Sequence, residues 1–536
     1  MLIVCVAITA HYIDQNFNLQ QELLAFEPIE GQHSGQNFAN IVFNTLQEYD
    51  IKGKFFCVTT DNASNNFTMA KELQKLLADE GIQWDAKTNH IPCLAHIINL
   101  VVQKFLSSLA ADEADNSSSF QSIIEKVRGV AKSIRGSYLR WEAFQRSCKS
   151  YGIEPMTIPL DITVRWNSTF LMLLQAVYLR RAIRRYVDDL DEELSELQLS
   201  EEEWEKVEVL LVFLLPFKRC TSRFECNRSY TEIDYVFFAY DTMYNHIDDV
   251  KAKLMSGNGI GALSCARYFL KSIEGMETIL KRYYSKTQFP TVYGDGMILN
   301  PRTKLVIFNE DTWEDTASEE YSNACRRRFI QEYDNPPNNP SHQIGNGNKR
   351  SFNAYQEDPD FQQVLAERSS KRRRNDYDRY IEIPNDPDIF SSLGWWRQNG
   401  RLYPDLSRMA RDVLPVPASG CAVEREFSIS GRMAIWQRNR LGARTISDSM
   451  MYKAALRKTR TPMLSPEITD ESDDVDSLTI PEREGNVPEE WIQNWWLKKL
   501  EKRPIRHEIV EMFHVSDGES ELGGPEEDLY GDQINM

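Results

Sequence analysis

The first hundred residues alternate short apolar runs with amphipathic stretches. Residues 2–11 form a short, β-branched apolar run and residues 19–26 a second, partly polar one; both predict strands. Residues 38–49 carry apolar side chains at helical spacing, residues 54–60 predict a third strand, and residues 62–77 predict a second helix. This order of strand, strand, helix, strand and helix indicates an α/β fold at the start of the chain.

Helical spacing dominates from about residue 103 to residue 300. The sharpest helix start is at Ser200, which Glu203 follows three positions later, just before apolar side chains that begin at Trp204. In this pattern, called a capping box, each of two side chains bonds the backbone amide of the other residue. A helix is therefore predicted to start directly after Ser200.

Residues 335–374 contrast with this helical region because they are rich in proline, asparagine and glycine. Such a segment lacks the apolar side chains of a core, so we predict a loop or linker. An apolar block follows over residues 388–458. One helix within it is marked by apolar side chains at helical spacing, namely Leu406, Met409, Ala410, Val413 and Leu414.

The chain beyond Ser465 is acidic, with 20 Asp or Glu and 6 Lys or Arg. We predict that it is largely disordered, apart from a short helix over residues 489–502 that carries Trp491, Trp495 and Trp496. The whole chain carries a net charge of −18, from 80 acidic and 62 basic residues. Without the tail the net charge is only −4, so the composition does not exclude a polyanionic partner.

Length and the remaining composition bound the class of protein. A chain of 536 residues exceeds the roughly 250–300 residues that one core supports, which indicates two or three folding units. No run approaches the roughly 18 apolar residues of a membrane span, so we expect no membrane partner. The nine cysteines are scattered without a CxxC pair, which is typical of reduced thiols.

Asp61 follows directly after the strand predicted over residues 54–60. A carboxylate at the C-terminal end of such a strand faces the sheet edge where α/β proteins place their sites. The same position also suits a helix cap, because Asp61 and Asn62 precede the next predicted helix. The residues by themselves leave both roles open.

Glu424 is the second candidate acid. On a helix it shares a face with Phe427, which favours a functional position, whereas Glu426 is predicted to face solvent. A partly buried Glu424 that pairs with Arg425 or Arg438 is the structural alternative.

Two further pairs of residues carry potential chemistry. Cys93 and His96 share a helical face, but a zinc site would need a second Cys/His cluster, which the sequence lacks; a structural or supporting role is favoured. Arg165 and Trp166 pair a cation with a ring that can stack on a base, although most tryptophans lie in cores. The basic runs at residues 326–328 and 371–374 are suited to phosphate contact or nuclear import, or are simply solvated.

Taken together, these motifs resemble the hAT superfamily of Ac-like DNA transposases, especially members with a BED-type zinc finger. The resemblance covers nearly everything from residue 2 to about residue 458. The markers occur in family order, namely AHYID at 10–14, TDNASN at 60–65, CLAHIINL at 93–100, RWNS at 165–168, EW at 203–204 with LPF at 215–217, ILNPR at 298–302, WW at 395–396, LSRMARD at 406–412, the Glu424 motif at 417–428 and RNRL at 438–441.

The resemblance implies an α/β fold with a ribonuclease-H-like core, here lacking its first strand, interrupted by a large all-helical insertion. The expected division is a first part of the core at residues 1–105, the insertion at 106–334, a polar and basic linker at 335–385, a helical C-terminal dimerisation region that completes the core at 386–460, and an acidic tail at 461–536.

By the same resemblance, Asp61 and Glu424 are catalytic residues and ligands of two Mg²⁺ or Mn²⁺ ions, which activate one oxygen and stabilise the other in phosphodiester chemistry. The family pattern assigns DNA contact or support of the site to six residues and dimerisation to five. The first set is Cys93, His96, Arg165, Trp166, Arg438 and Arg440, and the second is Trp395, Trp396, Leu406, Met409 and Phe427. DNA and a second copy of the chain are the implied partners, and the nucleus is the implied location.

The sequence departs from the family at its start. The first catalytic Asp of the family belongs on a strand before residues 2–10, and the BED zinc finger precedes that strand; neither is in this sequence. The first hypothesis is therefore a transposase-derived protein that dimerises and contacts DNA without full cut-and-paste activity. The alternatives are an active transposase with a missed N-terminal exon and a co-opted regulatory module that uses the acidic tail to bind a partner.

Overall fold

The computed structural model describes most of the chain up to residue 459 and a few residues of the tail. The described residues are 4–29, 31–112, 119–162, 165–190, 194–225, 231–256, 266–288, 290–309, 317–334, 375–385, 389, 391–433, 442–459, 487–488, 491–492 and 494–495.

The N-terminal elements follow the predicted order. They are β1 (Cys5–Ile13), β2 (Leu19–Pro28), α1 (Gly35–Glu48), β3 (Val58–Thr60), α2 (Ser64–Asp79), α3 (Ala86–Asn89) and β4 (His90–Pro92). β1 pairs with β2 in antiparallel fashion, and β3 pairs with β4 in parallel, so the described residues contain two separate two-stranded sheets. The third strand is shorter than predicted, because residues 52–54 form a 3₁₀ turn and pairing begins only at Val58.

Every element described between residues 94 and 334 is helical. The helices are α4 (Leu94–Asp112), α5 (Phe120–Arg135), α6 (Tyr138–Ser150), α7 (Trp166–Tyr178), α8 (Arg180–Asp189), α10 (Glu201–Glu225), α11 (Val236–Met255), α12 (Ala266–Tyr284), α13 (Val292–Leu299) and α14 (Ala317–Arg328), joined by short 3₁₀ and π turns. The capping box is confirmed: the Ser200 amide donates to Glu203 Oε2 at 2.8 Å, and the Glu203 amide donates to Ser200 Oγ at 3.2 Å.

Among the described residues, the α-helices of the C-terminal region are α16 (Asp376–Glu382), α17 (Ser392–Asn399), α18 (Pro404–Val413), α19 (Cys421–Met433) and α20 (Ala443–Thr459). The amphipathic helix predicted around Leu406 is confirmed as α18. The predicted linker at 335–385 is wrong at its C-terminal end, because α16 lies inside it with Tyr377 and Tyr380 in the core. Residues 335–374, the rest of the predicted linker, lie outside the described residues.

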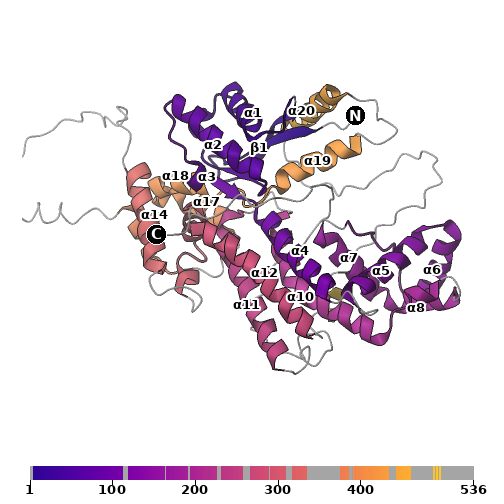
Figure 1. The fold of residues 1–536 in the computed structure, drawn as a ribbon. Helices are drawn as coiled ribbons and strands as arrows, with labels where there is room; N and C mark the ends of the chain where they lie inside the picture. Colours follow the sequence, from indigo (N-terminus) through magenta and orange to yellow (C-terminus); the bar gives the residue numbers. More distant parts are fainter. Residues whose placement is uncertain are drawn as a thin grey trace, which may run out of the picture.

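The C-terminal helices pack on the N-terminal strands. Phe26 of β2, with Ile446 and Met450 of α20, forms a buried cluster, and Phe427 of α19 contacts Phe26 with ring centroids 5.5 Å apart. Figure 1 shows α19 and α20, in orange, beside the indigo β1, with helices α5 to α12, in purple to pink, in the lower part of the view. Helices α19 and α20 therefore contact a strand from the start of the chain.

Two tryptophans of the acidic tail pack against the helical region. Trp491 contacts Tyr178 at the end of α7, with centroids 5.1 Å apart at 84°, and Trp495 stacks on Trp491 at 5.8 Å. Both are helical in the structure, as predicted, while Trp496 lies outside the described residues. Among the helices that the structure describes, none has the length and apolar character needed to cross a membrane.

Candidate functional site

Three segments that are distant in sequence are joined by hydrogen bonds at the ends of β3 and β4. The Cys93 amide donates to the Thr60 carbonyl at 2.8 Å, and the Leu94 amide donates to the Ala418 carbonyl at 2.8 Å. The Thr59 hydroxyl donates to the Pro417 carbonyl at 2.6 Å. We call this arrangement of residues 59–61, 90–94 and 417–420 the junction.

Glu232, a residue that was not predicted from the sequence, binds the third segment of the junction. The carboxylate of Glu232 accepts bonds from the Ala418 amide at 3.0 Å and from the Ser419 hydroxyl at 3.1 Å. The same Ser419 oxygen, which carries one hydrogen, also lies 2.8 Å from the Phe224 carbonyl. No local pattern around Glu232 signals this role, because the partners lie 186 and 187 positions away.

Burial shifts the pKa values of two side chains at or beside the junction, His90 and Glu232. Burial lowers the pKa of His90 to about 4, against the opposing effect of the Asp61 charge, so the imidazole is neutral at pH 7. Its Nε2 lies 2.8 Å from the Thr60 hydroxyl. Burial raises the pKa of Glu232 to about 7, which keeps a large share of this carboxyl group protonated near neutral pH.

Asp61 follows Thr60 at the edge of the junction and is exposed. Its Oδ1 accepts bonds from the Ala63 amide at 3.1 Å and from Asn66 Nδ2 at 2.5 Å. The helix-capping alternative is thus partly realised, since one oxygen organises the turn before α2, although the N-cap position itself is Ala63. Among the described residues, no hydrogen bond is made to the other oxygen, Oδ2.

Glu424 lies in the first turn of α19, where its amide donates to the Gly420 carbonyl at 3.2 Å. Its side chain is exposed. The prediction that Glu426 faces solvent is wrong: Glu426 is 3% exposed, and Arg457 Nη1 donates to its Oε1 at 2.8 Å. The reason is that α20 packs against α19 and covers the side of the helix that carries Glu426.

Cys93 sits at the centre of the junction, 3% exposed, with its Sγ accepting a bond from the Gly420 amide at 3.2 Å. Burial raises the pKa of its thiol to about 12, and the charge of Glu424 acts in the same direction. His96, one turn later, is half-buried, and its Nε2 has no hydrogen-bond partner among the described residues. No group of three or more His, Cys, Asp or Glu side chains suited to hold a metal occurs among the described residues.

Trp166 and Arg165 are placed at the start of α7. The Trp166 ring is 1% exposed and meets Phe170 edge-on at 6.1 Å. A ring so enclosed does not present a face to a base in this conformation. Arg165 is half-buried at the helix N-cap. Arg438 and Arg440 lie outside the described residues.

The predicted dimerisation residues divide into two groups. Trp396, Leu406 and Met409 are fully buried within this single chain, where Trp396 Nε1 donates to the Leu299 carbonyl at 2.8 Å. Their side chains are covered by this chain itself, and their role in dimerisation stays a prediction. Trp395 and Phe427 are half-buried.

The basic run at residues 326–328 is largely engaged in ion pairs. Arg326 binds Asp378 through two bonds of 2.6 and 2.9 Å, and Arg328 pairs with Asp295. These two guanidinium groups hold α14 in place and are not free for phosphate. Residues 371–374, the other basic run, lie outside the described residues.

Comparison with known families matches three segments in chain order. Residues 3–86 match the ZBED1 RNase-like domain, residues 91–213 match the ZBED1 RNase-like helical domain, and residues 376–456 match the hAT family C-terminal dimerisation region. The chain is an hAT-family transposase-like protein. The boundary between the first two matches falls just before Cys93, where β4 passes into α4.

Several known proteins resemble this hAT-family chain over most of its length. The putative transcriptional regulator tpeD of Talaromyces stipitatus is 28% identical over 83% of this chain and 51% of that protein. The putative AC transposase of Zea mays is 25% identical over 85% and 55%, respectively. The zinc finger BED domain-containing protein RICESLEEPER 2 of Oryza sativa subsp. japonica is 24% identical over 77% and 57%. The chain therefore spans little more than half the length of these relatives.

Proposed function

We propose that this hAT-family chain binds DNA and self-associates, and that Asp61 and Glu424 are the carboxylates that would hold Mg²⁺ or Mn²⁺ at the junction. The observation that carries this proposal is a pair of hydrogen bonds: the Cys93 amide donates to the Thr60 carbonyl, and the Gly420 amide donates to Cys93 Sγ. These bonds bring the residue before Asp61 and the helical turn that carries Glu424 to one place.

The donor set suits a hard divalent cation. Both side chains offer carboxylate oxygens on exposed positions, and Mg²⁺ prefers oxygen ligands while keeping several waters. In phosphodiester chemistry such an ion activates the attacking oxygen and stabilises the leaving one. The chain itself orients the two carboxylates. Hydrogen bonds from Ala63 and Asn66 hold Asp61, and the first turn of α19 holds Glu424.

Two carboxylates provide fewer ligands than a two-metal site requires, so we propose that the chain does not carry out complete cut-and-paste transposition. The expected behaviour is weak metal binding with retained DNA contact. The ribonuclease-H-like arrangement of the core is part of the same proposal, supported by the RNase-like family matches. Nuclear location is proposed from the family and from the basic run at residues 371–374.

A titration with Mn²⁺ tests the site directly. Electron paramagnetic resonance of free Mn²⁺ should show binding to the unaltered chain that is lost in Asp61→Asn and in Glu424→Gln. Both changes keep the shape and the hydrogen-bond acceptor of the side chain. Glu48→Gln, at an exposed position on α1, is the matched control. Equal binding in all four proteins would reject Asp61 and Glu424 as ligands.

A strand-transfer assay on DNA with Mg²⁺ or Mn²⁺ tests the proposed lack of activity. No cutting is expected from the unaltered chain, whereas duplex DNA should be retained and released by salt. Cutting that is abolished in Asp61→Asn and Glu424→Gln would show that the chain is an active transposase. Failure to retain DNA at low salt would reject the DNA contact.

A regulatory role is the second candidate. It is favoured by the similarity to a relative named as a putative transcriptional regulator, at 28% identity over 83% of this chain. This role needs DNA contact and self-association but no metal at Asp61. A protein that binds DNA and dimerises, with no Mn²⁺ site, would fit this second role.

A further inference from the structure

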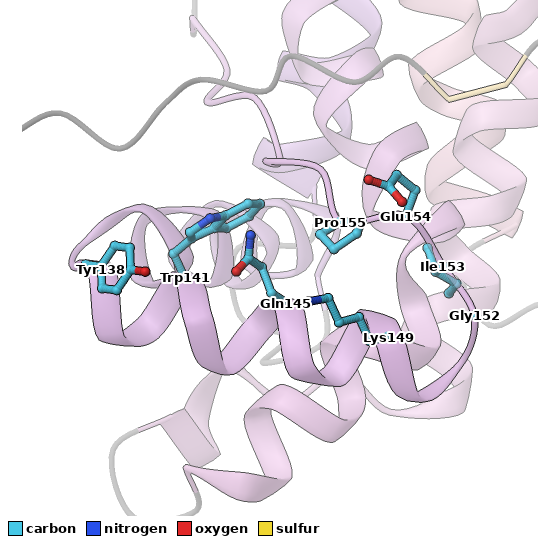
Figure 2. Close-up of a pocket in the computed structure, with 8 residues that line it drawn as sticks. All are labelled: Tyr138, Trp141, Gln145, Lys149, Gly152, Ile153, Glu154 and Pro155. Carbon is cyan, nitrogen blue, oxygen red and sulfur yellow. The ribbon is translucent and has the colours of Figure 1, made fainter.

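A pocket lies along α6, within the helical region and away from the junction. Its volume is about 620 Å³, and Figure 2 shows its lining: Tyr138, Trp141, Gln145 and Lys149 along one side of α6, with Gly152, Ile153, Glu154 and Pro155 on the segment that follows. A volume of this size falls within the range of small-ligand pockets, about 300–1,000 Å³.

The end of α6 explains why the pocket has a second wall. Gly152 adopts a positive φ of 66°, a conformation that glycine tolerates best, and its amide donates to the Lys149 carbonyl at 3.1 Å. The Ile153 amide donates to the Cys148 carbonyl at 3.1 Å. This helix-ending turn sends residues 153–155 back beside α6, so the two walls are fixed by backbone bonds.

Trp141 and Tyr138, the two aromatic residues of the pocket, differ in exposure. The Trp141 ring is 4% exposed and forms part of the floor, packed near Phe144 at 6.1 Å. Tyr138 is 66% exposed, so its ring is presented to solvent at one end of the pocket. An exposed ring beside an apolar floor is an arrangement on which planar bases stack.

The polar groups of the pocket are the Gln145 amide, the Lys149 ammonium and the Glu154 carboxylate. An amide both donates to and accepts from base edges, a carboxylate accepts from exocyclic amines, and an ammonium binds phosphate. Glu154 would repel a phosphate beside it, so the phosphate is expected at Lys149, and the base towards Tyr138 and Gln145.

Charge around the pocket favours a polyanion. Residues 119–190 contain 12 Lys or Arg and 6 Asp or Glu in a chain whose total charge is −18, although Lys126, Arg180 and Arg184 pair with Glu203 and Glu201 just beyond this range. Arg146 and Lys149 on α6 and Arg181 on α8 are exposed, with no ion pair recorded for any of them among the described residues. A proline-rich peptide would use the aromatic and apolar lining but gains nothing from this positive surface.

We propose that the α6 pocket binds an unpaired nucleotide of single-stranded DNA, with its base on Tyr138 and its phosphate on Lys149. This inference rests on the DNA contact proposed above and adds a site for it. Trp166 is enclosed in the core, so Tyr138 supplies the exposed ring that Trp166 does not.

Fluorescence anisotropy with labelled dT10 measures this site on the full chain. Tyr138→Ala should weaken dT10 binding by roughly 5- to 100-fold, the range expected for loss of one base stack. Tyr138→Phe keeps the ring and should keep the affinity. Lys149→Gln should reduce the slope of log affinity against log salt by about 0.7, the contribution of one phosphate contact on a single strand.

Matched controls separate the pocket from general effects. Tyr151→Ala removes a tyrosine that is 46% exposed but does not line the pocket, and Lys54→Gln removes an exposed lysine before β3; neither should change dT10 binding. Equal losses in Tyr138→Ala and Tyr151→Ala would overturn the proposal. Tighter binding of rU10 than of dT10, or competition by a proline-rich peptide at equal concentration, would overturn the assignment to DNA.

A parallel assay with duplex DNA distinguishes the two proposals. If the unaltered chain retains duplex but does not bind dT10, the pocket inference fails and the proposed DNA contact stands. If dT10 binds through Tyr138 while Mn²⁺ binding is unaffected by Asp61→Asn, the metal site fails and the pocket stands.

Discussion

The backbone amide of Gly420 donates a hydrogen bond to the sulfur atom of Cys93 at 3.2 Å. The same cysteine donates its own amide to the Thr60 carbonyl at 2.8 Å. One small buried residue therefore connects the strand that precedes Asp61 with the helix that carries Glu424. Its position explains why a cysteine with no metal partner and no disulfide is nevertheless central to the candidate site.

Replacing Cys93 with alanine is expected to destabilise the chain by about 1–3 kcal/mol. The change leaves the Gly420 amide without its acceptor and opens a small void in the core. Urea unfolding of the full chain measures this difference. Cys5→Ala, at a half-buried site on β1, is the control and should cost less than about 1 kcal/mol. Equal losses in both variants would contradict the role given to Cys93.

Glu232 makes stability depend on pH below neutrality. Its pKa in the folded chain is raised from 4.5 to about 7 by burial, so the protonated form is favoured by folding. This contribution is complete below pH 4.5 and is lost as the pH rises towards 7 and above. The unfolding free energy should therefore fall over this interval relative to that of Glu232→Gln, by an amount on the order of 2–3 kcal/mol.

Glu232→Gln is informative because glutamine stays neutral and still accepts the bonds from Ala418 and Ser419. Chemical unfolding of both proteins at pH 5, 6, 7 and 8 gives the comparison. Parallel curves across this range would show that Glu232 ionises normally in the folded chain.

Glu426 is buried and pairs with Arg457, which is 37% exposed, and this ion pair joins α20 to α19. Arg457→Met should destabilise the chain by about 1–3 kcal/mol, because it leaves the buried carboxylate without its partner, while solvent already screens the exposed guanidinium. The double variant Glu426→Leu with Arg457→Met should recover most of this loss, since no charge is left buried. Thermal unfolding of the three proteins tests the pair, and a double variant no more stable than Arg457→Met would contradict it.

Self-association is expected to use the exposed side of α20. Tyr452 and Leu456 lie one helical turn apart, 66% and 45% exposed, within the segment that matches the hAT dimerisation region. The double variant Tyr452→Glu with Leu456→Glu should raise the dissociation constant of self-association, measured by sedimentation, by roughly 10-fold or more. The free energy of unfolding should not change. Tyr138→Glu, at an exposed tyrosine on α6, should leave sedimentation unchanged.

Local patterns predicted the elements that depend on neighbouring residues. The capping box at Ser200 and the apolar face of α18 were confirmed, because both are set by spacings of three and four positions. The first two strands and the first two helices were confirmed for the same reason.

Predictions failed where distant segments decide which side of a helix is covered. Glu426 was placed in solvent because nothing near it signals that α20 covers that side of α19. Glu232 was missed because its contacts are nearly two hundred positions away.

The bond from the Thr59 hydroxyl to the Pro417 carbonyl joins residues 358 positions apart. A ribosome adds roughly 5–20 residues per second. Pro417, the acceptor for Thr59, is therefore synthesised on the order of 20–70 s after β3. The parallel pairing of β3 with β4 can form early, but the amide of Leu94 has no acceptor until Ala418 emerges. A translation product that stops before residue 417 should therefore remain bound to chaperones, with the ends of both strands open.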